Sequence, residues 1–208
     1  MDSFIPILCF LVSFATGIPA SGRLPSDVAT PDSVQGCSDI SERGLEWTAK
    51  NFHLHSSLSL TAPSQVSKGA AWVDFNVSNP AVPYEMHCSA FSTQLGDFFY
   101  GDELISCDGP SQDVTRSGHK NASFSFAKAS GTLWLYQNWL CNDGSDPNLP
   151  FSIWSAKGSV NIIFDCVTSS RKNPMWKGQG SGDIYSTDTV DCGFFDVNVA
   201  PSEVTALA

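Results

Sequence analysis

Two histidines separated by one residue form a pattern that can bind a transition metal. In "FHLHSSLSL" the imidazoles of His53 and His55 alternate with Phe52 and Leu54, so a β-strand would place both imidazoles on one face. Imidazole is a common ligand of zinc, copper, iron and nickel. The sequence shows no third ligand beside them, and we therefore interpret the pair as the polar face of a strand. We expect no metal and no cofactor.

Glu85 and Glu103 form a candidate pair for acid–base catalysis. They flank a segment that contains Cys88 and Cys107, and glycoside hydrolases need two carboxylates facing each other across the bond that they cleave. Nothing around the two glutamates indicates an aromatic sugar-binding cleft. We therefore interpret them as solvated positions on a strand and a turn, and we expect no catalytic residues. A small secreted β-sandwich glycoside hydrolase stays an alternative.

Two loop patterns are similar to functional motifs but have the wrong spacing. "GQGSGD" lacks the G-x-S-x-G order of a serine-hydrolase elbow. "NDGSDPN", residues 142–148, offers oxygen ligands but lacks the spacing of a calcium-binding loop. We interpret both as turns.

The N-terminal segment indicates where the protein acts. Residues 4–14 form an apolar run of eleven, which is shorter than the roughly 20 residues that a bilayer-spanning helix needs. Small residues follow it, so residues 1–20 are predicted to be a signal peptide, cleaved after Gly17 or Ala20. We expect a secreted, extracellular protein. No later segment is long and apolar enough to span a membrane, and no membrane partner is expected.

Cysteine content and charge agree with this location. Removal of the signal peptide would leave six cysteines, and an even number in a secreted chain favours disulfides. The formal net charge of −10 would repel phosphate backbones, so we expect no nucleic-acid partner. The six cysteines are Cys37, Cys88, Cys107, Cys141, Cys166 and Cys192.

The elements that would carry these residues are β-strands. Apolar residues alternate with polar ones in "AWVDFNVS" and "NASFSFA", and a period of two is typical of half-buried strands. "TLWLYQNWL" and "VNIIFDC" are apolar on both faces and are predicted to be central strands. We predict an all-β fold, an antiparallel β-barrel or sandwich of about eight to eleven short strands stapled by disulfides. The predicted inward set is Phe75, Val77, Phe124, Phe126, Leu133, Ile162 and Phe164.

The chain is predicted to hold one domain behind a flexible segment. Residues 21–45 are rich in Ser, Pro, Asp and Gly, which is typical of a flexible N-terminal arm. Residues 46–208 are predicted to form a single β-barrel domain. Two N-glycosylation acceptors, Asn76 and Asn121, fall on the polar faces of their strands, and we expect a glycan on at least one of them.

Several segments follow one another in a recognisable order. A cysteine precedes a strand that begins with tryptophan in "GCSDISERGLEWTAKNFHLH", and "MHCSAFSTQL" and "FYGDELISC" come next. They are followed by "ASFSFAKASGTLWL" and then by "NIIFDC" and "TVDCGFFDV". This order, over about 160 residues from Trp47 onward, resembles the fungal Alt a 1-like family, the small secreted proteins typified by the Alternaria major allergen.

The resemblance implies a disulfide-stapled β-barrel that is secreted by a fungus and has no established catalytic site. It implies an allergen-like or effector-like protein that binds a host protein or a cell-wall component and modulates plant defence. A structural protein of the cell wall or spore coat is a further alternative.

The resemblance also implies how the cysteines pair. In the family's order neighbouring cysteines are joined, which gives Cys88–Cys107 and Cys166–Cys192. These pairs leave Cys37–Cys141, which would anchor the N-terminal arm.

The same resemblance predicts the number of subunits and a candidate contact surface. The typical allergen links two subunits through a cysteine at the position of Cys37 and lacks Cys141, so we expect a monomer here. The segment stapled by Cys88–Cys107 would present a candidate contact loop at its tip, formed by Phe98, Phe99, Tyr100 and Gly101.

Overall fold

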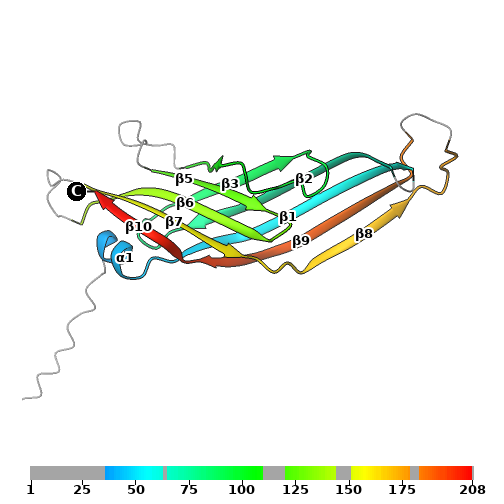
Figure 1. Ribbon diagram of the computed structural model, residues 1–208. Coiled ribbons are helices and arrows are strands. Elements are labelled where there is room, and N and C mark those ends of the chain that lie inside the picture. Colours follow the sequence, from blue (N-terminus) through cyan, green and yellow to red (C-terminus); the bar gives the residue numbers. More distant parts are fainter. Residues whose placement is uncertain (1–35, 63–64, 110–119, 144–150, 179–182, 208) are drawn as a thin grey trace, which may run out of the picture. The chain divides into compact units, whose positions relative to one another are not determined.

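The computed structural model describes residues 36–62, 65–109, 120–143, 151–178 and 183–207. These residues form two five-stranded antiparallel sheets and one short helix (Figure 1). Sheet A has the strand order β3-β2-β1-β9-β8, with β1 (Trp47–Ala62), β2 (Gln65–Ser78), β3 (Glu85–Ser92), β8 (Cys166–Lys172) and β9 (Ser186–Val199). Sheet B has the order β10-β7-β6-β5-β4, with β4 (Ile105–Ser106), β5 (Asn121–Ala127), β6 (Thr132–Cys141), β7 (Ser152–Asn161) and β10 (Pro201–Leu207).

The predicted fold class is confirmed: the chain is mostly antiparallel β and carries three disulfides. The two sheets do not close into a barrel, and the architecture is therefore a β-sandwich. Three strands are longer than expected, since β1 has 16 residues and β2 and β9 have 14 each. The strands of sheet B have ten residues or fewer.

The core is an aromatic cluster between the two sheets. The ring of Phe52 in sheet A lies 5.7 Å from that of Phe126 in sheet B, and Phe75 lies 5.0 Å from Phe124 across the same interface. Each such pair contributes about 0.5–1.5 kcal/mol beyond the burial of its area. The predicted inward residues are buried, with the exception of Phe164, which is half-buried.

One predicted central strand is wrong. The run "VNIIFDC" leaves β7 at Asn161 and continues as the connection 162–165, which leads from sheet B to β8 in sheet A. Ile162 is buried, and its N–H donates to the carbonyl of Gly131 at 2.8 Å. Ile163 points outward and is 96% exposed. A connection that crosses between sheets buries some of its apolar residues and exposes others, which local periodicity does not reveal.

The end of the predicted flexible arm is structured. Helix α1 (Cys37–Arg43) begins one residue after Gly36, and the disulfide Cys37–Cys141 joins it to the end of β6. The hydroxyl of Ser41 accepts the indole N–H of Trp139 at 3.0 Å. These contacts anchor the helix on the sandwich. Residues 1–35, which include the predicted signal peptide, lie outside the described residues.

The other two disulfides have different structural roles. Cys166 and Cys192 lie directly opposite each other on β8 and β9. Cys88, on the edge strand of sheet A, is joined to Cys107, which follows β4 at the edge of sheet B. This second bond therefore connects the two sheets and does not staple a hairpin within one sheet. All three pairs are those that the family resemblance implies.

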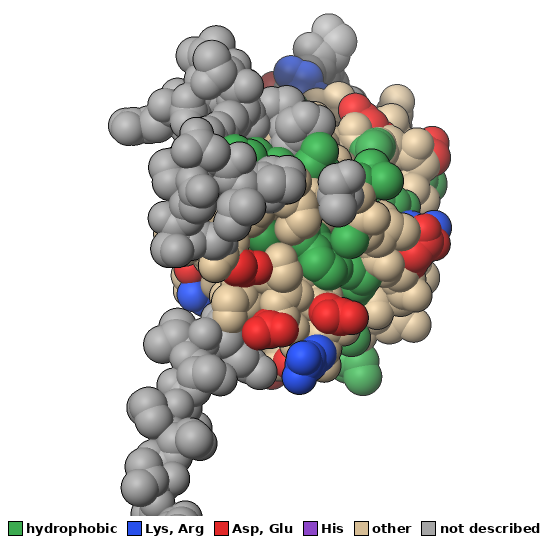
Figure 2. All heavy atoms as spheres, turned by 90° about the vertical axis from the view of Figure 1, so that its left-hand side faces the viewer, with side chains coloured by type: hydrophobic (Ala, Val, Ile, Leu, Met, Phe, Trp, Pro, Cys, Tyr) green, Lys and Arg blue, Asp and Glu red, His purple; other side chains and the backbone are tan. Residues whose placement is uncertain are grey.

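In the described part of the chain, no helix is long and apolar enough to cross a membrane. Figure 2 views the molecule from the left-hand side of Figure 1 and shows hydrophobic side chains near the middle of that face. Acidic side chains are scattered around them.

Candidate functional site

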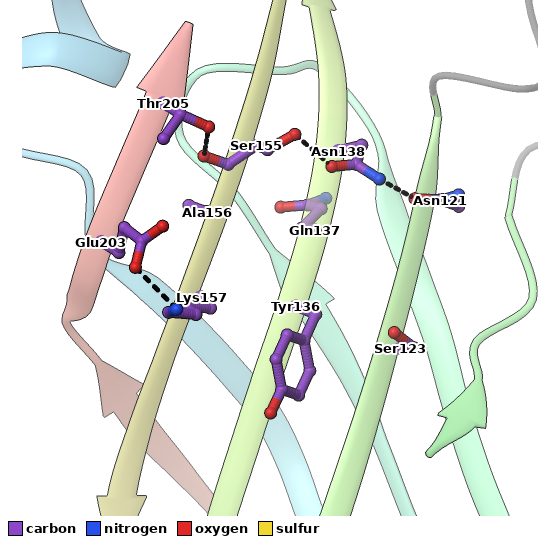
Figure 3. A pocket seen from close by; sticks show the side chains of 10 residues that line it. All are labelled: Asn121, Ser123, Tyr136, Gln137, Asn138, Ser155, Ala156, Lys157, Glu203 and Thr205. Atoms are coloured by element: carbon purple, nitrogen blue, oxygen red, sulfur yellow. Dashed lines mark hydrogen bonds and ion pairs between the residues drawn. The ribbon is translucent and has the colours of Figure 1, made fainter.

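The outer face of sheet B carries a groove of about 250 Å³. Strands β5, β6, β7 and β10 form its floor, and most of its lining side chains are uncharged and polar (Figure 3). The lining residues are Asn121, Ser123, Tyr136, Gln137, Asn138, Ser155, Ala156, Lys157, Glu203 and Thr205.

Strand register places eight of the ten lining residues in two rows that cross the sheet, while Gln137 and Ala156 alternate to the inner face. In the first row Asn121 lies opposite Asn138, Asn138 opposite Ser155, and Ser155 opposite Thr205. Because side chains opposite each other in antiparallel strands point to the same face, the row presents two amides and two hydroxyls side by side.

The second row lies two residues further along each strand. Ser123 lies opposite Tyr136, Tyr136 opposite Lys157, and Lys157 opposite Glu203. The row thus contains a hydroxyl, an aromatic ring and an ion pair. The ring of Tyr136 is 37% exposed, so a ligand in the groove can reach it.

Hydrogen bonds fix the side chains of the first row. The amide of Asn138 donates to Oδ1 of Asn121 at 2.8 Å, and the hydroxyl of Ser155 donates to Oδ1 of Asn138. The hydroxyl of Thr205 donates to the main-chain carbonyl of Ser155 at 3.4 Å. These bonds, drawn in Figure 3, orient the row before any ligand binds.

The charges in the second row compensate each other. Nζ of Lys157 lies 2.6 Å from a carboxylate oxygen of Glu203, and both side chains are about half-exposed. The hydrogen bond to Glu203, together with the charge of that carboxylate, raises the pKa of Lys157. An exposed pair of this kind adds little to stability, so its main effect is to fix two polar side chains.

The groove has the chemistry of a binding site. Of its ten lining residues, Glu203 is the only carboxylate, and none is a histidine or cysteine. The pair of carboxylates that glycoside hydrolysis requires is thus absent from the groove, while oriented amides, hydroxyls and one aromatic ring suit a polyhydroxylated ligand.

The two histidines of the metal-like pattern share one carboxylate. Nδ1 of His55 lies 2.8 Å from Oδ2 of Asp191, and Nε2 of His53 lies 3.4 Å from the same oxygen. The hydrogen bond from His55 is the main cause of a lowered pKa for Asp191. The imidazole of His53 stacks on the ring of Phe194, and that of His55 stacks on the ring of Trp72. Within the described ranges, no group of three His, Cys, Asp or Glu side chains is arranged to hold a metal ion.

The structure separates the two candidate catalytic glutamates. Glu85 begins β3 and pairs with Lys50 at 2.6 Å. Glu103 lines a different hollow, together with Phe91 and Ser92 at the opposite end of β3. Six residues of extended strand correspond to about 20 Å, which is well beyond the roughly 5–10 Å between the carboxylates of a glycosidase.

The candidate contact loop differs from the expectation. Phe98 and Phe99 are only 2% and 6% exposed, and the ring of Phe98 lies against Gly69 of β2. The inner face of sheet A extends beyond sheet B at this point, and the loop covers it. Tyr100, at 49% exposure, is the aromatic residue that the loop presents to solvent, while Gly101 lines a hollow of about 120 Å³.

The two predicted glycosylation acceptors lie on outer faces. Asn76 of β2 is half-buried between the neighbouring strands, and Asn121 is exposed at the edge of the groove. Nδ2 of Asn121 points away from the groove in Figure 3, so a glycan there would extend from the groove's margin. The loop patterns at 142–148 and 178–183 lie largely outside the described residues.

Sequence reasoning missed the groove itself. Alternation in "NASFSFA" indicates that Asn121 and Ser123 share a face, and the same holds for Tyr136 and Asn138 in β6. Which of these faces come together depends on which strands pair, and the pattern of one strand does not identify its partner strand.

Comparison with models of known protein families gives a match over the middle of the chain. The model of the family described as Alternaria alternata allergen 1 matches residues 50–192, which is more than half of the chain. No curated protein and no solved structure matches the chain. The matched region contains Cys88–Cys107 and Cys166–Cys192 and spans most of both sheets. The chain therefore belongs to the Alternaria alternata allergen 1 family.

Proposed function

We propose that this protein is a secreted, non-enzymatic, effector-like protein that binds a carbohydrate component of a cell wall in the groove on sheet B. The observation that carries the proposal is the row formed by Asn121, Asn138, Ser155 and Thr205. Three disulfides suit an extracellular protein, and such a location would bring the groove into contact with wall polymers. Through this binding the protein would modulate plant defence.

The chemistry of the groove favours a neutral sugar unit. Sugar hydroxyls both donate and accept hydrogen bonds, and the amides and hydroxyls of the first row do the same. The exposed ring of Tyr136 offers an apolar surface to the C–H groups of a sugar ring. Because Lys157 and Glu203 neutralise each other, the groove offers no excess charge to an ionic ligand.

The test is a titration of the purified secreted protein with oligomers of β-linked glucose and of β-linked N-acetylglucosamine, followed by NMR. We expect amide shifts to concentrate on β5, β6 and β7. Asn138→Ala and Tyr136→Ala should each weaken binding about tenfold, which corresponds to roughly 1.4 kcal/mol.

Asn161→Ala is the matched control. Asn161 is also an outward asparagine on a sheet B strand, and it accepts a hydrogen bond from Thr132 outside the groove. Its replacement should leave binding unchanged. Shifts that avoid the groove, or equal losses in the control, would contradict the proposed site.

A further inference from the structure

Four basic side chains in this acidic protein have no partner in the described residues. Nine lysines and arginines fall in the described ranges. Arg43, Lys50 and Lys157 are in ion pairs, while Lys120 and Lys128 lie over aromatic rings. The remaining four, all of them exposed, are Lys68, Arg171, Lys172 and Lys177.

The four unpaired cations gather at one end of sheet A. Lys68 lies opposite Ser59, Ser59 opposite Thr187, and Thr187 opposite Arg171. This row crosses β2, β1, β9 and β8 at the right-hand end of Figure 1. Lys172 ends β8, and Lys177 follows in the turn. We call Lys68, Arg171, Lys172 and Lys177 the basic end.

Register places Lys68 and Arg171 on the outer face. Arg171 lies four residues beyond Val167, which is opposite Asp191 on that face, and Lys68 lies four residues before Trp72. Neighbouring strands are about 4.8 Å apart, so three intervals separate Lys68 from Arg171 by about 14 Å. A single small anion is much shorter than the distance between these two positions. A polymer with repeated negative charges can span it.

A hollow of about 310 Å³ adjoins the row. No carboxylate lines it. Asp188 of β9 lies on the opposite face of the strand from Thr187, the face that Lys172 at the end of β8 also takes by register. The lining residues are Arg171, Lys172, Asn173, Pro174, Ile184 and Thr187. The hollow thus combines two cations with an amide and a hydroxyl.

Hydroxyl groups continue this surface along the strands. Ser57 lies opposite Thr189 and Thr189 opposite Ser169 in the next outward row, and the hydroxyls of Ser169 and Thr189 are 2.7 Å apart. A polysaccharide chain presents hydroxyl groups that can form hydrogen bonds with this row, whereas binding to a lipid surface does not require such a row.

We infer that the basic end and its hydroxyl row bind an acidic polysaccharide, a linear sugar polymer that carries a carboxylate on its repeating unit. Charge complementarity is the main argument: the chain has a net charge of −10, yet this surface offers four cations that have no partner among the described residues. The surface lies on sheet A, whereas the proposed neutral-sugar groove lies on sheet B. The two proposals therefore stand or fall separately.

The test uses the purified full-length secreted protein and polygalacturonate as the probe, with binding measured by calorimetry at low salt. The double variant Arg171→Gln with Lys172→Gln should weaken binding at least tenfold. Raising the salt from 50 to 200 mM should weaken binding of the unaltered protein on the order of tenfold, because exposed charges are screened within about 10 Å at 0.1 M.

The matched control is Arg43→Gln with Lys50→Gln, which removes the same charge from two ion-paired side chains elsewhere and should change binding less than twofold. Equal losses in both double variants would overturn the proposal in favour of a general charge effect. Fully methyl-esterified polygalacturonate, which is neutral, should not bind; equal binding of it would also overturn the inference.

Two further measurements distinguish polysaccharide binding at this surface from binding in the groove on sheet B and from binding to a lipid surface. Asn138→Ala, in the groove of sheet B, should leave polygalacturonate binding unchanged, and a loss there would contradict a separate site. Vesicles of phosphatidylcholine with 30% phosphatidylserine should not bind. If they bind as tightly as polygalacturonate and depend on Arg171 and Lys172, the partner is a lipid surface and the inference is wrong.

Discussion

The side-chain carbonyl of Gln137 accepts the indole N–H of Trp47 at 2.8 Å inside the sandwich. The same oxygen accepts a second hydrogen bond, from the amide of Asn79 at 2.8 Å. All three side chains are buried. Gln137 belongs to sheet B and Trp47 to sheet A, so one acceptor joins the two sheets and satisfies two donors that water cannot reach.

Gln137→Leu should destabilise the protein by on the order of 2 kcal/mol, because it leaves two buried donors without an acceptor. Urea unfolding followed by fluorescence would measure the loss. Gln94→Leu is the control, since Gln94 is exposed on a loop, and it should change the free energy of unfolding by less than about 0.5 kcal/mol. Equal effects of the two substitutions would show that the buried network contributes nothing.

Phe126→Ala should cost roughly 3–5 kcal/mol, because the ring is buried and its removal leaves a cavity in the core. Phe126 contacts Phe52, Phe99 and Phe164. Phe91→Ala provides the comparison, since Phe91 is 67% exposed and should tolerate truncation. Thermal and denaturant unfolding of both variants test this; a loss near zero for Phe126→Ala would mean that the inward face is misassigned.

The pairing of Asp191 with His55 predicts a pH dependence of stability. The hydrogen bond from His55 lowers the pKa of Asp191 in the folded protein, so ionised Asp191 favours the folded state above the ordinary Asp pKa of about 4. That contribution is lost as the pH falls from about 4 through the lowered value. The unaltered protein should therefore be more stable than Asp191→Asn at pH 6. This difference in the free energy of unfolding should shrink when the pH falls below the lowered pKa of Asp191.

Asp183→Asn is the control for this pH series, because Asp183 is exposed and makes no ion pair with the described residues. Its curve should run parallel to that of the unaltered protein. A constant difference between the unaltered protein and Asp191→Asn across the series would contradict the role given to Asp191.

Non-reducing peptide mapping should recover the pairs Cys37–Cys141, Cys88–Cys107 and Cys166–Cys192. Because Cys37 bonds within the chain, it is not available to link two subunits, and we expect a monomer. Sedimentation and a non-reducing gel would check the mass. A peptide cross-linked between two copies of Cys37 would overturn both the pairing and the monomer.

Secretion through a eukaryotic pathway should add a glycan to Asn76, Asn121 or both, since both lie on outward strand faces. Removal of N-glycans by an amidase should then reduce the mass of the native protein. Asn121→Gln and Asn76→Gln, made separately, would assign the site. An unchanged mass after amidase treatment would show that neither acceptor is used.

Period-two patterns were sufficient to identify the faces of the strands. Phe75 and Val77, and likewise Phe124 and Phe126, point inward as expected, because alternation along one strand is a local property. The pairing of β7 with β10 brings together residues as far apart as Ile153 and Leu207, which are 54 positions apart in the chain, and no local pattern specifies it. The groove depends on that pairing and was therefore not predictable.

Helix α1 is a second feature that could not be predicted from the sequence. The prediction of a flexible arm rested on the Ser, Pro, Asp and Gly content of residues 21–45. The seven residues of the helix are fewer than the 12–15 that an isolated helix needs for stability in water. Tertiary contacts, among them the disulfide to Cys141, stabilise it. Likewise the burial of Phe98 depends on the extension of sheet A beyond sheet B, which composition does not reveal.

The positions of the three disulfides divide the chain into two covalent blocks. The bond Cys37–Cys141 encloses the bond Cys88–Cys107, whereas Cys166–Cys192 stands apart from both. A single protease cut within 38–140 or 167–191 leaves the two fragments joined by a disulfide. A single cut within 142–165 instead yields two pieces with no covalent link, held together only by strand pairing and the core. Under denaturing, non-reducing conditions, one nick in this stretch is enough to separate the two disulfide-bonded blocks from each other.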